Sequence, residues 1–396
     1  MKRTSFLFFL LLIPFFSFAH NANNKRTFKF KEVKKLSFEV YDTISPRGQS
    51  YCLWQTFYDM NQEKVYTGDY ISDKKAFLYI ECDFKKAELK SVKISYPDAP
   101  MGVDGVVFCK WLPSGNLCVR SNYSNQIQIY SLDGKLQKEI SLSFLEKNKE
   151  AYSCSPYGKL LVCNQKLSLQ TIPNASVDNR ADRAEVNSKT FGVSIDLKKG
   201  KRHKSLKIHY PSNYQEGNFY YNNNYALAMN RNNQLICSFR CNDSIFVYDN
   251  NKEFVKAFYA GSDSKPEFIP FDEDKQSSTA EISRYNKVEP YYDNLLFDPI
   301  RNLCYRFFYD RLSYDLNVIK CPGFSQKRQS VIIIDRDFNR MGEVEFKDGD
   351  VHPTTQSVPT EEGLMNVCDH GLIYGKPSVR KFTLNWLKLV EVGHHG

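Results

Sequence analysis

The chain has 396 residues, enough for one large repeat domain or two ordinary domains. It contains 25 Tyr and 29 Phe but no long apolar stretch of helical period beyond its first residues, and this favours an all-β chain with a substantial core. The formal net charge of +9 is a mild excess for this length, and the basic residues are mostly dispersed, so nucleic-acid binding is not indicated.

The first nineteen residues have the pattern of a secretory signal peptide. Lys2 and Arg3 precede an apolar run over residues 6–16, and small residues end this segment near Ala19, where a signal peptidase would cut. The run is too short for a comfortable membrane span, and no later stretch approaches the roughly 20 apolar residues of a spanning helix. We expect cleavage near Ala19, export to the periplasm or beyond, and a flexible stub over residues 20–27. His20 stands where a bacterial lipoprotein would need cysteine.

Residues 28–40 alternate between apolar and polar side chains, as in Phe28, Phe30, Leu36 and Phe38, and predict a strand. This strand has no hairpin partner nearby in the sequence. Five β-hairpins follow, each with two alternating runs joined by a turn. The turns contain Asp, Asn or Gly, which suit tight reversals. The hairpins cover residues 77–96, 127–142, 191–210, 245–259 and 331–346.

A second repeated feature, two short strands joined by a tight turn, precedes each hairpin and occurs once more near the end of the chain. The six turns are predicted at residues 61–64, 113–116, 156–159, 230–233, 298–302 and 360–363. Each unit is therefore read as strand A, turn, strand B, connection, strand C, turn, strand D. Four-stranded units at this spacing predict a β-propeller.

The sixth unit has strands A and B and one further strand at residues 382–390, so it lacks a fourth strand. The unpaired N-terminal strand can supply it and close the ring. We predict an all-β, six-bladed propeller of four-stranded antiparallel blades over residues 28–392, with a short tail at 393–396. A seven-bladed propeller and a pair of β-sandwiches are the alternatives.

The blade segments also resemble a known family. The phrases Ser114-Gly115-Asn116-Leu117 and Asn233-Gln234-Leu235, with the run from Asn242 to Asp249, are similar to blades of TolB-like and NHL-like six-bladed propellers. Together with the signal peptide, the chain resembles a family of exported six-bladed propellers of unknown function from Gram-negative gut bacteria. The resemblance covers nearly all of the mature chain and implies a fold without implying an activity.

Eleven cysteines in an exported chain invite a disulfide interpretation, but the number is odd. Cys118, Cys163, Cys237 and Cys304 lie shortly after predicted turns, inside short apolar strands. We expect buried free thiols that act as small apolar side chains, with one or more disulfides as the alternative.

The long connections of the predicted propeller all fall on one face. In a propeller, the A–B and C–D turns lie on one face and the B–C and D–A connections lie on the other. The connections at residues 173–190, 211–224, 261–290 and 310–329 are of the second kind. Insertions in repeat proteins gather where partners bind, which favours a binding face here over neutral insertions.

Polar residues recur in the B–C connections on this face. An arginine and an asparagine two residues later precede the C strand in two units, at nearly the same offset: Arg120 with Asn122, and Arg240 with Asn242. The equivalent region of unit five carries Arg306, Asp310 and Arg311. Arginine and asparagine would suit a polar or anionic ligand. Local bonds to the backbone and pairing with neighbouring acids are the alternative, which the sequence favours slightly.

Tyr220 and Tyr221 lie among asparagines in the connection at residues 211–224. Aromatic faces beside amides are typical of sugar-binding surfaces. Ordinary packing is the favoured alternative, because aromatic residues are abundant throughout the chain.

No catalytic or zinc-binding motif is present in the sequence. The acidic run Asp272-Glu273-Asp274 lacks the spacing of a calcium loop and favours a solvated loop over a calcium site. We therefore expect no cofactor and no catalytic residue, and a non-enzymatic module that binds a protein, peptide or glycan. The alternative is a metal-dependent propeller hydrolase, similar to a lactonase, with its site at the central channel.

Overall fold

The computed structural model describes the backbone of most predicted strands and many of the connections. The described residues are 27–41, 55–59, 64–71, 76–83, 88–95, 107–112, 114–121, 126–131, 133–144, 150–152, 161–163, 166–173, 184–185, 188–219, 224–275, 278–312, 327–346, 357–373 and 376–392. For residues 55–95 only the backbone is described. The predicted signal peptide, nearly all of the stub after it and the tail at 393–396 lie outside these ranges.

The described residues form six four-stranded antiparallel sheets and one two-stranded sheet. We call the four-stranded sheets blades one to six. Their strands, in spatial order, are β2 (Gln55–Asp59), β3 (Lys64–Ile71), β4 (Ala76–Asp83) and β5 (Glu88–Ser95) in blade one; β6 (Val107–Trp111), β7 (Leu117–Ser121), β8 (Gln126–Tyr130) and β9 (Leu136–Ser141) in blade two; and β11 (Leu161–Cys163), β12 (Lys166–Leu169), β14 (Phe191–Asp196) and β15 (Lys201–Ile208) in blade three.

Blades four to six follow the same order along the chain. Their strands are β16 (Tyr225–Met229), β17 (Leu235–Phe239), β18 (Ser244–Tyr248) and β19 (Phe254–Tyr259); β20 (Tyr291–Asp298), β21 (Leu303–Tyr309), β22 (Gln329–Ile334) and β23 (Arg340–Glu345); and β24 (Ser357–Pro359), β25 (Leu364–Ile373), β26 (Lys376–Val392) and β1 (Thr27–Tyr41). The two-stranded sheet pairs β10 (Glu150–Tyr152) with β13 (Thr171–Pro173).

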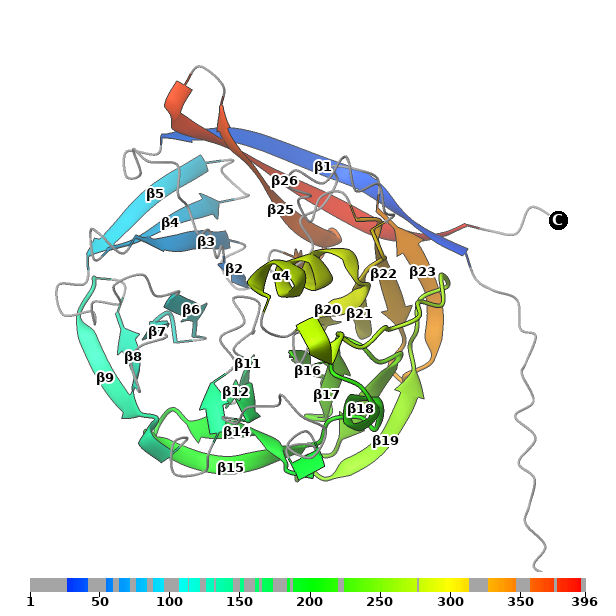
Figure 1. Ribbon diagram of the computed structural model, residues 1–396. Coiled ribbons are helices and arrows are strands. Elements are labelled where there is room, and N and C mark those ends of the chain that lie inside the picture. Colours follow the sequence, from blue (N-terminus) through cyan, green and yellow to red (C-terminus); the bar gives the residue numbers. More distant parts are fainter. Residues whose placement is uncertain are drawn as a thin grey trace, which may run out of the picture.

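The blades follow one another around a centre, with the first strand of each blade inside and the last at the rim (Figure 1). The inner strand β20 contacts the inner strands β16 and β24 of its neighbours, and β24 contacts β2 of blade one. This is the propeller-like arrangement that the sequence predicts. No helix in the described part of the chain is long and apolar enough to cross a membrane.

The N-terminal strand completes blade six. β1 pairs antiparallel with β26 from Thr27 opposite Val392 to Tyr41 opposite Val379, with one irregularity between Glu32 and Lys34. Figure 1 shows β1 and β26 side by side although they come from opposite ends of the chain. The prediction that the unpaired N-terminal strand supplies the missing fourth strand is confirmed, and the pairing covers an edge of β26 that would otherwise be exposed.

Turn chemistry explains why the C–D hairpins reverse where they do. Asp249 Oδ1 accepts hydrogen bonds from the backbone of Asn251 and Glu253, at 2.8 and 2.9 Å. Asp335 repeats this arrangement in the next C–D hairpin with Asp337 and Asn339, both at 2.8 Å. An aspartate at the start of the turn therefore takes up backbone donors that the reversal leaves unpaired.

One predicted turn is wrong. The sequence places the A–B turn of unit three at residues 156–159, whereas β11 and β12 pair with Cys163 opposite Lys166, so the chain reverses between these two residues. Residues 156–159 lie outside the described ranges. The error arose because Pro156 and Gly158 are strong turn formers, while Asn164-Gln165 contains neither proline nor glycine.

Among the described side chains, the core lies between neighbouring blades, from blade two to blade six. β22 is buried at every position, and its side chains alternate between two clusters. Ile332 and Ile334 pack toward blade four, and Val331 and Ile333 pack toward blade six. Cys118, Cys237, Cys241 and Cys304 are buried free thiols, as predicted for three of them, and the side chain of Cys163 lies outside the described part.

Candidate functional site

The long connections of blades four and five meet on one face, which we call the loop face; the opposite face, which carries the tight turns, is the turn face. The Asn213 side-chain amide donates to the carbonyl of Cys241 at 2.6 Å. The backbone of Phe271 donates to Asn218 at 2.8 Å, and the backbone of Leu312 donates to Val288 at 3.0 Å. Two D–A connections and two B–C connections therefore hold one another in place.

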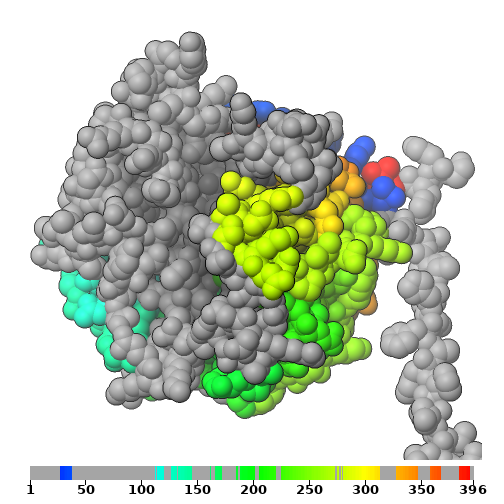
Figure 2. Space-filling model, viewed as in Figure 1, coloured from blue at the N-terminus to red at the C-terminus, as the bar shows by residue number. Residues whose placement is uncertain are grey.

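Two helices form within these connections, and the sequence did not predict either. α3 (Asn213–Glu216) is a single turn, and α4 (Thr279–Val288) has ten residues. Ser278 caps α4, because its hydroxyl accepts a hydrogen bond from the backbone of Glu281 at 3.3 Å. The pattern Ser278-x-x-Glu281 is the start signal of a helix. Figure 2 shows the yellow-green residues around α4 at the surface of this face.

Beneath the C-terminal end of α4 lies a group of charged side chains around Tyr291, the first residue of β20. We call this group the Tyr291 cluster; it consists of Arg240, Glu289, Tyr291, Asp293, Arg311 and Lys327. The Tyr291 ring is 1% exposed and stacks on Tyr309 with ring centres 4.9 Å apart. The guanidinium carbon of Arg240 lies 4.3 Å from the centre of the Tyr291 ring, and Lys327 Nζ lies 4.6 Å from it.

Helix α4 helps to explain why the cations gather here. The last carbonyls of a helix lack partners inside the helix and carry partial negative charge. Lys327 Nζ donates to the carbonyl of Glu289, and the backbone of Leu312 donates to that of Val288. Arg311 Nη2 donates to the Glu289 carboxylate at 2.8 Å. Both described ends of the B–C connection of blade five therefore bind the end of α4.

Burial and neighbouring charges perturb the titration of this cluster. Burial, together with the Arg240 guanidinium, lowers the pKa of Lys327 to about 7, whereas Glu289 acts in the opposite direction. Burial raises the pKa of Glu289 above its usual range, against the effect of Arg311. Burial acts to lower the pKa of Arg240, because it disfavours the charged form. The Asp293 carboxylate at 2.9 Å, together with Tyr291, has the larger effect in the opposite direction, so the pKa of Arg240 is raised. Perturbed groups of this kind are typical of functional sites, although structural ion pairs also produce them.

Of the predicted arginine and aspartate residues, the structure brings Arg240, Asp310 and Arg311 together at this end of blade five. The Arg311 side chain is about one-third exposed, and its Nη2 also donates to the carbonyl of Glu267 at 2.9 Å. Asp310 accepts from the backbone of Arg311 at 2.8 Å and lies 4.0 Å from Arg328. Arg311 therefore offers a more exposed charged group on the loop face than Asp310, whose side chain is 23% exposed.

Asn242 and Arg306 have structural roles in the connection. Asn242 accepts from the backbone of Ser244 at 2.8 Å and donates to the Asn213 side chain at 3.1 Å. Arg306 is fully buried, and it donates to the Ser238 hydroxyl at 2.8 Å and to backbone carbonyls. Those carbonyls belong to Phe239, Ala260 and Asn242. The alternative of local bonding and pairing thus describes Asn242 and Arg306 better than an exposed ligand site does.

Several predicted residues lie outside the described part. Asn122, Tyr220 and Tyr221 are not described, and the side chain of Arg120 is not described although its backbone belongs to β7. Within the described residues, no three His, Cys, Asp or Glu side chains come together as a metal site would require. In the acidic run, Asp272 accepts from the backbone of Asp274 at 3.1 Å and pairs with Lys275 at 3.3 Å.

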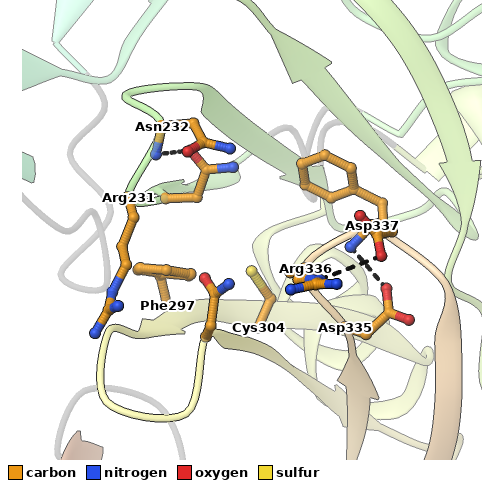
Figure 3. A pocket seen from close by; sticks show the side chains of 10 residues that line it. Arg231, Asn232, Phe297, Cys304, Asp335, Arg336 and Asp337 are labelled. Carbon is orange, nitrogen blue, oxygen red and sulfur yellow. Dashed lines mark hydrogen bonds and ion pairs between the residues drawn. The ribbon is translucent and has the colours of Figure 1, made fainter.

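A small hollow opens on the turn face between blades four and five (Figure 3). Its volume is about 80 Å³, and its lining includes Arg231, Phe297, Cys304 and Asp337. Ligand pockets usually have roughly 300–1,000 Å³, so this hollow suits a few water molecules and not an organic ligand. The loop face therefore remains the better candidate.

The comparison with known families agrees with this architecture. The sequence profile of a family described as "Domain of unknown function (DUF4221)" matches residues 27–345. The chain belongs to this family. A crystal structure of a DUF4221 member from Bacteroides vulgatus covers 93% of this chain and 100% of its own length, with a TM-score of 0.71 at 18% identity. At this identity the match shows that the DUF4221 fold is shared, and nothing about an activity.

More distant solved structures resemble the DUF4221 fold weakly. Virginiamycin B lyase from Staphylococcus aureus is 11% identical, with a TM-score of 0.39 over 91% of this chain and 100% of the lyase. A Bacteroides fragilis protein described as exported is 8% identical, with a TM-score of 0.45 over 91% of this chain and 96% of that protein. These likenesses are too remote to carry a functional argument. None of the curated proteins matches the chain.

Proposed function

We propose that this DUF4221 protein is an exported six-bladed propeller that binds a protein, peptide or glycan through its loop face. One observation carries the proposal: the connections of blades four and five hold one another through specific hydrogen bonds, so the surface they present is preorganised. Asn213 with Cys241, Phe271 with Asn218 and Leu312 with Val288 are those bonds. A preorganised surface loses little conformational entropy on binding.

The chemistry of this surface favours a polar partner. The exposed positions of α4 include Ala280 and Ser283, which are small, and Arg311 presents a partly exposed guanidinium nearby. Ile269 is the one large apolar side chain among the described residues of the connections that exceeds one-third exposure. Arginine forms paired hydrogen bonds with carboxylates, and both peptides and acidic glycans carry such groups.

The export part of the proposal rests on residues 1–19. Lys2, Arg3 and the apolar run that follows have the composition of a signal peptide. Mass spectrometry of the protein secreted or released from the periplasm should give an N-terminus near His20. Retention of Met1 in the mature protein would contradict export by this route.

The binding proposal is tested by screening and then mapping. The purified mature chain is applied to a glycan array and to a library of defined peptides, and each hit is titrated. Amide hydrogen exchange is then compared with and without the hit. The proposal predicts slower exchange in α4 and residues 310–312 and no change in the turn-face residues 230–233. Protection confined to the turn face, or no hit in either library, counts against it.

The alternative of a metal-dependent hydrolase is tested on the same preparation. Elemental analysis after dialysis measures bound metal per chain, and a panel of lactone and ester substrates measures hydrolysis. A stoichiometric divalent ion together with hydrolysis that a chelator abolishes would replace the binding proposal.

A further inference from the structure

The rim strand of blade four exposes more apolar surface than the described rim strands around it. Phe254 and Val255 are each 54% exposed and Tyr259 is 57% exposed, and all three belong to the six-residue strand β19. β19 is the last strand of its sheet, and within the described residues no strand pairs with its outer edge (Figure 1). An exposed apolar edge is a template for pairing with another strand.

Other rim strands carry the charges that normally prevent such pairing. β9 contains Lys138 and Glu139, and β15 and β23 are also rich in charged residues, whereas β19 has Lys256 as its single charged residue. Charged side chains on edge strands oppose association between sheets. β19 therefore lacks a protection that the rims of blades two, three and five have.

The hydrogen-bonding direction along β19 follows from one backbone hydrogen bond just after its last residue. The backbone of Ala260 donates inward to Asp243 at 2.8 Å. Because the direction alternates along an antiparallel strand, Phe258 and Lys256 also point their backbone groups inward. The backbone groups of Ala257 and Tyr259 therefore point outward, toward the unpaired edge.

We propose that β19 pairs antiparallel with β19 of a second copy of this chain, with the two-fold axis at Ala257. In such a pair, the outward backbone groups of Ala257 in the two copies bond to each other. This is an isologous interface, in which both copies use the same surface.

Charge and side-chain size select the register. In an antiparallel pair, residues directly opposite each other point their side chains to the same face of the sheet. A two-fold axis must therefore pass through a residue position, so that even-numbered residues face even-numbered ones and odd-numbered residues face odd-numbered ones. An axis at Lys256 would place two lysines opposite each other, which is unfavourable. An axis at Ala257 puts the smallest side chain of the strand at the centre and Lys256 opposite Phe258. Within one copy, Lys256 Nζ already lies 5.2 Å from the Phe258 ring centre, a favourable cation–aromatic contact.

The two ends of β19 differ in charge. Near Phe254, the lysines Lys207 and Lys252 are matched by the carboxylates of Glu253 and Asp249. Near Tyr259, the groups that act on its hydroxyl are three carboxylates and one arginine. They are Asp243, Asp263, Glu343 and Arg340. Antiparallel pairing brings the acidic end of one copy beside the balanced end of the other and keeps the two acidic ends apart, so like charges do not oppose this pairing.

Sedimentation velocity over roughly 1 to 100 µM tests the pairing, since an interface this small is expected to dissociate in that range. The wild type should shift from monomer to dimer with concentration. Val255→Lys and Tyr259→Lys each add a charge to the edge and should weaken association at least about tenfold. Leu136→Lys, at a 39% exposed position on β9, is the matched control and should dimerise like the wild type.

A disulfide scan tests the register. Ala257→Cys places two cysteines on the axis, where directly opposite Cα atoms lie about 5.5 Å apart, a separation that a disulfide spans. This variant should form a disulfide-linked dimer under mild oxidation, identified by peptide mapping. Lys256→Cys, whose opposite residue is Phe258, should form much less. A monomeric wild type at every concentration, or association that both edge lysines leave unchanged, overturns the proposal. A monomer that instead captures a synthetic extended peptide along β19 replaces the second copy with a peptide.

Discussion

The guanidinium carbon of Arg306 lies 3.5 Å from the centre of the Tyr292 ring, and both side chains are buried between blades four and five. The Tyr292 hydroxyl donates to Asp243 at 2.5 Å and accepts from the backbone of Ser262 at 2.9 Å. Arg240 and Tyr291 form a second arginine–tyrosine contact one residue earlier on β20. Two consecutive tyrosines of β20 thus contact two arginines, Arg240 from the B–C connection of blade four and Arg306 from β21.

Replacing Arg306 with lysine should destabilise the protein strongly. Lysine keeps the charge, but it cannot reach the Ser238 hydroxyl and three carbonyls in the fixed geometry of the guanidinium. Unsatisfied buried groups cost about 1–3 kcal/mol each, and we expect a loss of about 3 kcal/mol in the free energy of unfolding. Urea denaturation measures it. Arg336→Lys, at a 73% exposed position, should leave the midpoint unchanged, and equal midpoints for the two variants would contradict this assignment.

The pH dependence of stability should reveal Lys327. Its pKa is about 7 in the folded chain and close to 10.5 when unfolded, so the unfolded state binds more protons between these values. Stability therefore increases as pH rises above 7, and below about pH 7 this contribution stays at its minimum. Urea midpoints from pH 6 to 9 should rise more steeply for the wild type than for Lys327→Met. Parallel curves would show that Lys327 titrates normally.

The buried thiols should resist alkylation. Burial raises the pKa of Cys241 and of Cys304 to about 12, and it raises that of Cys237 as well. Only the thiolate reacts readily. At pH 8, iodoacetamide should leave these three cysteines and Cys118 unmodified in the folded protein and modify all four in urea, as measured by peptide mapping. Labelling of Cys304 in the native protein would mean that blade five opens readily.

Closure by the N-terminal strand predicts that β1 stabilises the whole ring. Phe28 is 8% exposed, and Phe30 stacks on Phe346 of the preceding blade with ring centres 5.6 Å apart. Phe28→Ala should cost about 3 kcal/mol, since it leaves a cavity between blades five and six. Val33→Ala, at a 45% exposed position of the same strand, is the control. Two separate unfolding transitions for Phe28→Ala would indicate that β1 stabilises blade six alone.

Much of the architecture could be predicted because it is local. Alternation of apolar residues and aspartate-initiated turns identify the hairpins ending in β19 and β23, and the unpaired strand at Phe28 implies its distant partner. The A–B turn of blade three was placed wrongly, since Asn164-Gln165 is a weaker turn signal than Pro156. α4 was missed although Ser278 and Glu281 form a helix-start pattern, because its ten residues include few large apolar side chains and so give little helical periodicity.

The candidate site was predictable only in part because it depends on tertiary contacts. Arg240, Asp310 and Arg311 could be singled out by residue type, but whether an arginine faces solvent depends on strand parity and packing, and Arg306 points into the core. Lys327 gives no sequence signal. Its low pKa results from burial and from Arg240, which comes from another blade.

The affinity of two matched surface variants for a partner found by the screen tests the central claim most directly. Ser283→Arg adds a bulky charge to an exposed position of α4 on the loop face, and Asn232→Arg adds the same side chain to an exposed turn on the opposite face. Titration calorimetry should show at least about tenfold weaker binding for Ser283→Arg and wild-type affinity for Asn232→Arg. Unchanged affinity for Ser283→Arg, with a loss for Asn232→Arg, would contradict binding through the loop face.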